Sequence, residues 1–128
     1  MRGRLGARGD AIYYSAMFAR LTQFDLHHRI AEQTATTLVF FTSPACASCR
    51  HLKVVLGEIS ARHPEWRVFE VDAQQEAGLV NEFDVFHLPS LFLFARGDFH
   101  AALSCEASPG AIEAAVASAL LQPAQEAP

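Results

Sequence analysis

The sequence lacks an excess of positive charge and any long hydrophobic run. Among its 128 residues, 10 Lys and Arg are outnumbered by 14 Asp and Glu, which gives a formal net charge of -4. A chain without a basic surplus has no extended basic face for nucleic acid, so we expect no nucleic-acid partner. No stretch of about eighteen consecutive apolar residues occurs, and we therefore expect no membrane-spanning helix.

The N-terminal part also lacks the continuous apolar core of a secretory signal. Its most apolar stretch, "AIYYSAMFARL", is interrupted by Ser15 and Arg20, so we expect a cytoplasmic protein. The length suits one domain with its own core. We expect a flexible segment over residues 1–15, a domain over residues 16–122 and a tail over residues 123–128.

Cysteine is scarce, with only Cys46, Cys49 and Cys105 in the chain. An odd and small number does not make a disulfide scaffold, so a close pair points to catalysis or metal binding. Cys46 and Cys49 are such a pair, in the stretch "SPACASCR". Three interpretations are open: a redox couple, half of a metal site, or two small buried residues.

The pair follows a predicted strand and begins a predicted helix. Residues 36–43, "TTLVFFTS", form a short run rich in β-branched and aromatic residues, which predicts a buried strand ended by Pro44. Apolar residues then recur at spacings of three and four, which predicts one buried helix face as far as Arg62. Cys46 is expected in the first turn of this helix.

The other segments complete an alternating pattern that ends in a hairpin. Alternating strands and helices require a largely parallel sheet, and a terminal hairpin adds an antiparallel edge. The fold class is therefore α/β, with a central mixed sheet. The predicted segments are strands at 18–22 and 66–72, helices at 24–33 and 73–83, a hairpin at 90–104 turning at Gly97-Asp98, and a helix after Ser108-Pro109.

A redox role for the pair follows from thiol chemistry. A thiol attacks only as its thiolate, and the first turn of a helix stabilises negative charge through its free N–H groups and its dipole. Cys46 is the expected attacking thiol, and Cys49, one turn further in, is the expected resolving thiol. Arg50 and His51 either add positive charge or are simply solvated residues on a helix face.

A metal site is the second functional interpretation of the cysteine pair. Zinc prefers four ligands, commonly from a second CxxC or a regularly spaced Cys/His pair, and the sequence has neither. Cys105 and His87 are the residues that would have to complete such a site. Since no second motif supports it, we expect no metal.

The order of a strand, CxxC at a helix start and "HLPSLFLFARGDF" some forty residues later resembles the thioredoxin family. The resemblance covers approximately residues 18–121 and implies the thioredoxin fold, with helices on both faces of the sheet. In that family an X-Pro sequence, usually with a cis proline, precedes the fourth strand and packs against the cysteine pair. Leu88-Pro89 matches this position, where an extended substrate can pair as an added strand.

Several positions depart from the family pattern. The family's "WCGPC" appears here as "ACASC", so Ala45 replaces the tryptophan and Ser48 the proline. The family's buried aspartate, six residues before the first cysteine, is Phe40, and its lysine partner on the third strand is Val68. Both halves of a buried ion pair thus become apolar, a change that need not destabilise the fold.

The departures leave the proton transfer at Cys49 to another group. Water, Glu70 and His87 are the candidates. The resemblance places Cys105 on the substrate-docking face after the fifth strand, beside the proline loop that contains His87, where a third thiol either has a redox role or is a small residue ending a strand. Five phenylalanines are expected in the core: Phe83, Phe86, Phe92, Phe94 and Phe99.

The expected function is thiol–disulfide exchange with protein substrates, with reduction as the working direction. Cys46 and Cys49 are the expected catalytic residues, and His87, Leu88, Pro89 and Cys105 are expected to bind substrate. No cofactor is expected beyond the redox-active Cys46–Cys49 disulfide, and the expected partners are disulfide-bonded proteins and a recycling reductase or thiol donor. The alternative function is a binding or adaptor module with vestigial or regulatory cysteines.

Overall fold

The computed structural model describes residues 18–128. The segment over residues 1–15, expected to be flexible, and the first two residues of the expected domain lie outside the described residues.

A five-stranded mixed sheet forms the centre of the molecule, with the strand order β1-β3-β2-β4-β5. The first three strands in this order are parallel, while β4 runs antiparallel to both β2 and β5. The mixed sheet predicted from the alternating pattern is therefore confirmed. The strands are β1 (Ala19–Arg20), β2 (Thr37–Thr42), β3 (Arg67–Asp72), β4 (Ser90–Ala95) and β5 (Asp98–Leu103).

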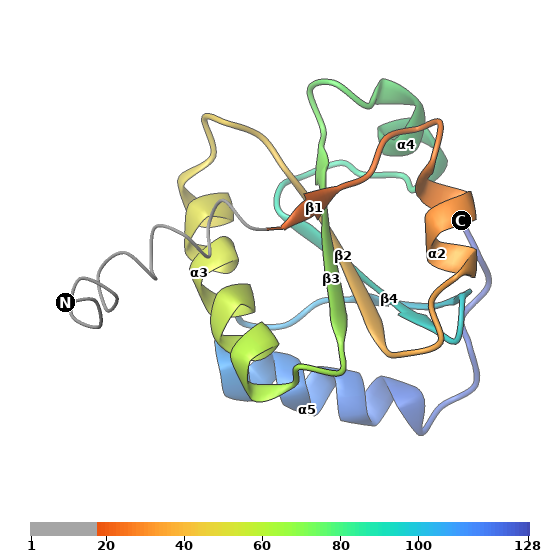
Figure 1. Ribbon diagram of the computed structural model, residues 1–128. Coiled ribbons are helices and arrows are strands. Elements are labelled where there is room, and N and C mark those ends of the chain that lie inside the picture. The colour runs from red at the N-terminus through yellow and green to blue at the C-terminus, as the bar shows by residue number, and fades with distance from the viewer. Residues whose placement is uncertain (1–17) are drawn as a thin grey trace, which may run out of the picture.

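Two helices cover each face of the sheet (Figure 1). The helices α2 (Leu26–Ala31) and α4 (Ala77–Glu82) pack on one face, against a core that contains Phe41 and Phe92. The helices α3 (Ala47–Arg62) and α5 (Pro109–Leu120) pack on the other. All six residues of β2 are buried, because this central strand is covered on both sides, as its continuous apolar run predicts.

The helix α3 follows the predicted apolar stripe, with five buried residues at spacings of three and four. Its C-terminus is also as predicted, since His63 N donates to Ile59 O at 2.8 Å and Pro64 cannot continue the ladder. At the start of α5, Ser108 is the N-cap and accepts a hydrogen bond from Ala111 N at 3.3 Å. The buried stripe of α3 consists of Cys49, Leu52, Val55, Leu56 and Ile59.

Several predicted boundaries differ from the structure: β1 and α2 are shorter than the predicted ranges 18–22 and 24–33, and the hairpin turn and the start of α4 are shifted. The hairpin turns at Arg96 and Gly97, with φ angles of 52° and 86°, and not at Gly97-Asp98; two successive positive φ angles are typical of the tight turns that fit the twist of a hairpin. The helix α4 begins only at Ala77, because Asp72 Oδ1 accepts a hydrogen bond from Gln74 N at 2.9 Å and stabilises a turn there instead.

The last residues, expected to form a tail beyond the domain, lie along the outer edge of β5. Gln125 N donates to His100 O at 2.7 Å, and Ala102 N donates to Gln125 Oε1 at 3.0 Å. An edge strand presents unpaired backbone groups that can pair with another chain. Gln125 satisfies two of these groups on β5.

Phe86 is not in the core, and this part of the predicted core is wrong. The other four phenylalanines of the predicted set contribute to one aromatic cluster on the α2/α4 face, where three are buried and Phe99 is partly buried. Phe86 is instead 89% exposed. The chain leaves α4 through Asp84, whose φ is 52°, and Val85 and Leu88 pack inward in its place.

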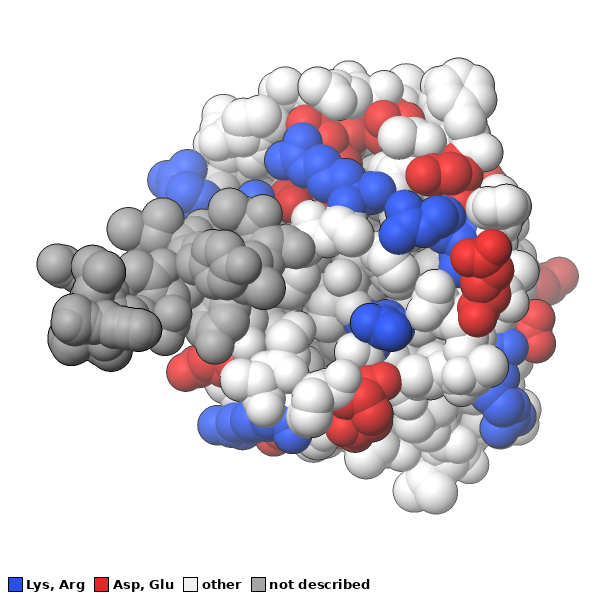
Figure 2. Space-filling model, in the orientation of Figure 1, with Lys and Arg blue, Asp and Glu red and all other residues white. Residues whose placement is uncertain are grey.

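Within the described residues, no helix is long and apolar enough to cross a membrane. On the face drawn in Figure 2, basic side chains form a short row across the upper part, with acidic side chains beside it, and the centre of this face is largely uncharged.

Candidate functional site

Cys46 is the N-cap of α3, one position before the predicted first turn. Its backbone is extended, with φ -100° and ψ 110°, and its Sγ accepts a hydrogen bond from Cys49 N at 3.1 Å. A helix N-terminus leaves its first N–H groups without intrahelical partners and favours negative charge. The position therefore suits a sulfur that has to carry negative charge.

Cys46 and Cys49 form a disulfide, with their Cα atoms 5.2 Å apart. The two residues differ in exposure: Cys46 is half-buried, whereas Cys49 is 1% exposed. The hydroxyl group of Ser48 lies next to the outer sulfur, with Oγ 3.5 Å from Cys46 Sγ. An exchange reaction at this pair has access to Cys46 and not to Cys49.

His51 connects the first turns of α3 to the loop before α5. Its Nε2 lies 3.0 Å from Ala107 O, and since a carbonyl oxygen only accepts, this ring nitrogen carries the proton. Arg50 is exposed and makes no salt bridge with any other described residue.

The proline loop lies between α4 and β4. The Leu88–Pro89 peptide bond is cis, and both residues are half-buried. Ser90 Oγ donates to His87 O at 2.8 Å, which holds the turn together at the start of β4. Leu88 packs toward the α2/α4 core, so its side chain points away from the α3/α5 face.

A groove of about 880 Å³ is lined by three of the six predicted site residues. It is lined by Ala47 and Ser48, which separate the two cysteines, and by His87, Pro89 and Cys105 from the two neighbouring loops. The structure thus brings three of the four predicted substrate-binding residues to the redox pair. Leu88, the fourth, does not line the groove.

Cys105 is a free and exposed cysteine in the loop after β5. Partial burial of its sulfur raises the pKa of the Cys105 thiol above its usual value of 9.0, because desolvation disfavours the thiolate. Cys105 is therefore a weaker nucleophile at neutral pH than an ordinary surface cysteine. Within residues 18–128, no group of three or more His, Cys, Asp or Glu side chains is placed to hold a metal ion.

The structure contains a buried ion pair next to α3 that was not predicted from the sequence. Glu70 on β3 is 3% exposed, and one of its carboxylate oxygens lies 3.0 Å from Lys53 Nζ and accepts a hydrogen bond from Thr42 Oγ1 at 2.7 Å. Glu70 is the register partner of Phe40 across the two strands. Phe40 and Val68 stand where the family has its aspartate and lysine. Glu70 and Lys53 nevertheless place a carboxylate and an ammonium group on the same side of the sheet, beneath α3.

Two patterns in the sequence indicate the side of the strand and the side of the helix on which these residues lie, although neither pattern pairs the two. Alternation along "RVFEVD" places Glu70 on the same face of β3 as Val68, toward α3, and Lys53 follows Cys49 by four residues on one side of that helix. The other candidate for proton transfer, His87, is exposed at the groove.

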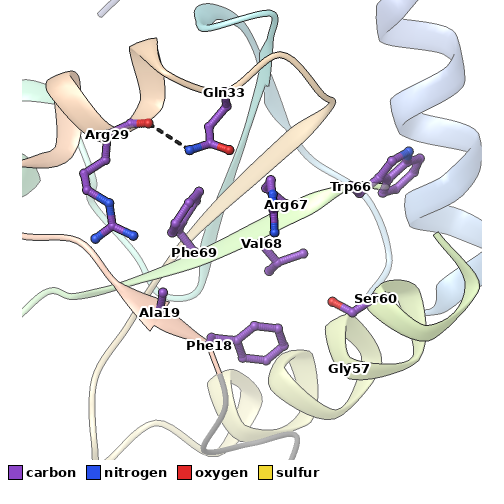
Figure 3. A pocket seen from close by; sticks show the side chains of 10 residues that line it. All are labelled: Phe18, Ala19, Arg29, Gln33, Gly57, Ser60, Trp66, Arg67, Val68 and Phe69. Atoms are coloured by element: carbon purple, nitrogen blue, oxygen red, sulfur yellow. Dashed lines mark hydrogen bonds between the residues drawn. The ribbon is translucent and has the colours of Figure 1, made fainter. Parts of the chain in front are cut away.

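A second cavity, of about 470 Å³, lies at the opposite edge of the sheet (Figure 3). It is bordered by β1, the start of β3 and residues of α2 and α3, and Gln33 Nε2 donates to Arg29 O at 3.0 Å beside it. The Arg29 guanidinium also lies 5.4 Å from the centre of the Phe69 ring. This cavity shares no lining residue with the groove that Ala47 and Ser48 line, so the two hollows are separate.

Comparison with known structures shows the same fold at low sequence identity. Mitochondrial thioredoxin 3 from Saccharomyces cerevisiae, in its oxidized form, is 18% identical, with a TM-score of 0.73 over 82% of this chain and 98% of that one. A structure from a study of thiol resolution in yeast mitochondrial 1-Cys peroxiredoxin is 17% identical, with a TM-score of 0.72 over the same shares. Human ERp44 in a zinc-bound form is 18% identical, with a TM-score of 0.68 over 79% of this chain and 29% of that one.

Sequence comparison gives the family. H-type thioredoxins from Brassica campestris and Brassica napus are 28% identical over 67 residues, which is 52% of this chain and 54% of each relative. The match thus spans about half the length of these relatives. A family model described as Thioredoxin matches residues 17–118. The chain therefore belongs to the thioredoxin family, and its Cys46–Cys49 disulfide supports thiol–disulfide oxidoreductase activity in general.

Proposed function

We propose that this protein reduces disulfide bonds in partner proteins, with Cys46 as the attacking thiol and Cys49 as the resolving thiol. The observation that carries the proposal is the unequal placement of the two sulfurs: Cys46 is half-buried at the helix N-terminus, and Cys49 is 1% exposed. A partner's disulfide reaches only the outer sulfur.

The exchange balances in two steps. The Cys46 thiolate attacks one sulfur of the partner's disulfide, that S–S bond breaks, and the other partner sulfur leaves with the electron pair and takes a proton. Cys49 then loses its proton and attacks Cys46 Sγ, which forms the Cys46–Cys49 disulfide and releases the second partner thiol. The pair is oxidised by two electrons and the partner is reduced by two.

We assign the removal of the Cys49 proton to Glu70, which lies on β3, in preference to His87. Glu70 is buried beneath α3 and bonded to Lys53, which lies one turn beyond Cys49. His87 is exposed at the groove, on the side where the partner has to bind. A buried carboxylate keeps the proton path away from the docking partner.

Thiol–disulfide exchange at this pair also indicates the substrates, the recycling partner and the compartment. The substrates are disulfide-bonded proteins that bind at His87, Pro89 and Cys105 and along the backbone of Leu88, and no cofactor is needed beyond the cysteine pair. Each cycle leaves the pair oxidised, so a dithiol donor or a reductase has to recycle it. Reduction as the working direction favours a reducing compartment such as the cytosol.

The test is turnover of disulfide-bonded insulin, with dithiothreitol as the electron donor. Wild type is expected to accelerate the reaction, Cys46→Ser to abolish the acceleration, and Cys49→Ser to accumulate a mixed disulfide with insulin on Cys46. Cys105→Ser is the matched cysteine replacement: serine is nearly the same size as cysteine, so the binding surface is retained and this variant should keep much more turnover than Cys46→Ser. Equal, negligible turnover in wild type and Cys46→Ser would reject the proposal.

An adaptor module without redox turnover is the second candidate. The observation that favours it is the exposed phenyl ring of Phe86 in the proline loop, since an exposed large apolar side chain commonly marks a binding surface. If the adaptor function holds, partner capture survives replacement of both Cys46 and Cys49 by serine. If the oxidoreductase function holds, that double variant loses covalent capture.

A further inference from the structure

Phe86 belongs to the loop between α4 and β4, and other residues of this loop line the groove. Phe86 is 89% exposed and lies between Asp84 and His87, which both line that groove. The opposite wall includes Ala47 and Ser48, the two residues between the cysteines. A partner that reaches the disulfide through the groove therefore passes the loop that carries this ring.

The groove itself is largely apolar at its base. Four buried residues from α3, β4 and α5 line it, and they belong to the core of the molecule: Leu52, Leu91, Phe92 and Ile112. The apolar base, and the exposed ring of Phe86 in the bordering loop, both lose unfavourable contact with water when a large apolar side chain covers them.

The charged groups that line the groove are acidic. Asp84 comes from the loop after α4 and Glu106 from the loop after β5, and neither makes a salt bridge with any other described residue. No Lys or Arg is among the groove's lining residues, and the two histidines there are His51, bonded to Ala107 O, and His87. The groove thus complements a positively charged segment.

We propose that this groove, with Phe86 at its rim, selects disulfides flanked by a large apolar residue and by a lysine or arginine in an extended segment of the partner protein. The inference rests on the proposed reductase function and deepens it by naming the substrate class. Phe86 and the groove base bind the apolar side chain, while Asp84 and Glu106 attract the cation. The exchange reaction and its electron balance stay as described above.

The test uses four symmetric peptide disulfides, each made of two short peptides joined through a single cysteine. The residues that flank the cysteine are Leu and Lys, Leu and Glu, Ser and Lys, or Ser and Glu. The protein is reduced with dithiothreitol, freed of it, mixed with each peptide disulfide, quenched with acid and analysed by chromatography. Bis(2-hydroxyethyl) disulfide, which has no such side chains, is the reference substrate.

For wild type we expect the Leu/Lys peptide to react about tenfold faster than the Ser/Lys peptide, the loss that removal of one aromatic or apolar anchor commonly causes. We expect Leu/Lys to react about threefold faster than Leu/Glu at low salt, with the gap closing at high salt because exposed charges are screened. Phe86→Ser should remove the preference for Leu. Asp84→Asn combined with Glu106→Gln should remove the preference for Lys.

The controls separate docking from chemistry. Asn tolerates the positive φ at position 84, so Asp84→Asn changes the charge without straining the turn. Phe24→Ser alters a phenylalanine that is also 89% exposed but follows β1, at the opposite edge of the sheet from β4 and β5. Phe24→Ser should match wild type on every peptide and on the reference substrate. For each other variant, the rate on a peptide is divided by the same variant's rate on the reference substrate, so that a change in the chemistry is separated from a change in docking.

The outcomes are distinguishable. If wild type reduces no disulfide in the set, the reductase function itself fails. If it reduces all four peptides equally, or if Phe86→Ser and Phe24→Ser have the same effect, only the substrate preference fails. If Phe86→Ser leaves the peptide rates unchanged and instead abolishes self-association in sedimentation, the ring serves contact with a second copy, which also overturns the preference.

Discussion

Two residues, Lys53 and Glu70, form an ion pair in the interior of this protein. Glu70 has its carboxylate in an apolar layer, where an isolated charge is strongly unfavourable, and Lys53 Nζ compensates it at 3.0 Å. Thr42 Oγ1 adds a hydrogen bond at 2.7 Å. Arg20 also approaches the carboxylate, at 3.6 Å, but its side chain is 53% exposed, so most of the compensation comes from Lys53.

We predict that Lys53→Met lowers the free energy of unfolding by about 3 kcal/mol, because it leaves the Glu70 carboxylate buried without its partner. The double variant Lys53→Met/Glu70→Leu should lie within about 1 kcal/mol of wild type, since removing both charges also removes the desolvation cost. Urea unfolding measures both.

Arg20→Gln is the matched control for this pair, because Arg20 contacts the same carboxylate from the solvent side. It should cost less than Lys53→Met, because Lys53 still neutralises Glu70; the cost that remains includes the contact of Arg20 with Asp72 at 3.6 Å. A double variant as unstable as Lys53→Met would contradict the ion-pair explanation and point to lost packing instead.

The β4–β5 hairpin depends on one glycine. Gly97 has φ 86°, and a Cβ at this position would lie 3.0 Å from the carbonyl oxygen of Ala31, at the end of α2. The position therefore combines a backbone conformation that favours glycine with a close approach between two elements. Arg96, the other turn residue, also has a positive φ, of 52°. The close approach to Ala31 is found at Gly97.

We predict that Gly97→Ala lowers the free energy of unfolding by about 1 to 3 kcal/mol, because a residue with a Cβ is strained at positive φ. Gly110→Ala, in the first turn of α5, is the matched control: a Cβ there meets nothing within 4 Å, and the change should be neutral or stabilise by up to about 1 kcal/mol. Thermal unfolding compares the two, and equal effects would contradict the role given to Gly97.

The end of α3 is held to α5 by an ionisable contact. His63 Nε2 donates to Glu113 Oε2 at 2.7 Å, and Arg62 donates to the other oxygen at 3.1 Å. The hydrogen bond from His63, followed by the one from Arg62, holds the pKa of Glu113 below its usual value of 4.5. The ionised form is thus favoured in the folded protein.

A lowered carboxyl pKa contributes stability above its unfolded value and loses it as the pH falls through the folded value. We therefore predict that the midpoint of thermal unfolding of wild type exceeds that of Glu113→Gln near about pH 6. The difference should shrink as the pH falls below 4.5. Glu65→Gln, which removes a carboxylate 3.7 Å from the same histidine, is the control and should show little pH-dependent difference. A gap that grows on acidification would contradict the assignment.

For the whole molecule, the order of the elements and the mixed sheet could be predicted because each main segment has a clear pattern. The run "TLVFFT" is apolar throughout because β2 is covered on both faces. The stripe that begins at Cys49 sets the face and length of α3. The pair of cysteines could be located at the start of that helix for the same reason.

Features that depend on contacts between distant segments could not be predicted with these patterns. Phe86 has an apolar side chain and neighbours typical of a core, but the turn at Asp84 directs Val85 inward and leaves the ring exposed. The partnership of Lys53 with Glu70 joins a helix to a strand 17 positions later, and only the packing of α3 on β3 creates it. The position of Gln125 along β5 likewise needs the folded sheet.

The most direct test of the account is an equilibrium redox titration of the Cys46–Cys49 dithiol in defined thiol–disulfide buffers, followed by the fraction of alkylated thiol. A protein that reduces partner disulfides should show one two-electron transition with a midpoint below about -200 mV. A midpoint above about -150 mV, in the direction of oxidising proteins, or a pair that does not titrate at all, would contradict the proposed reductase.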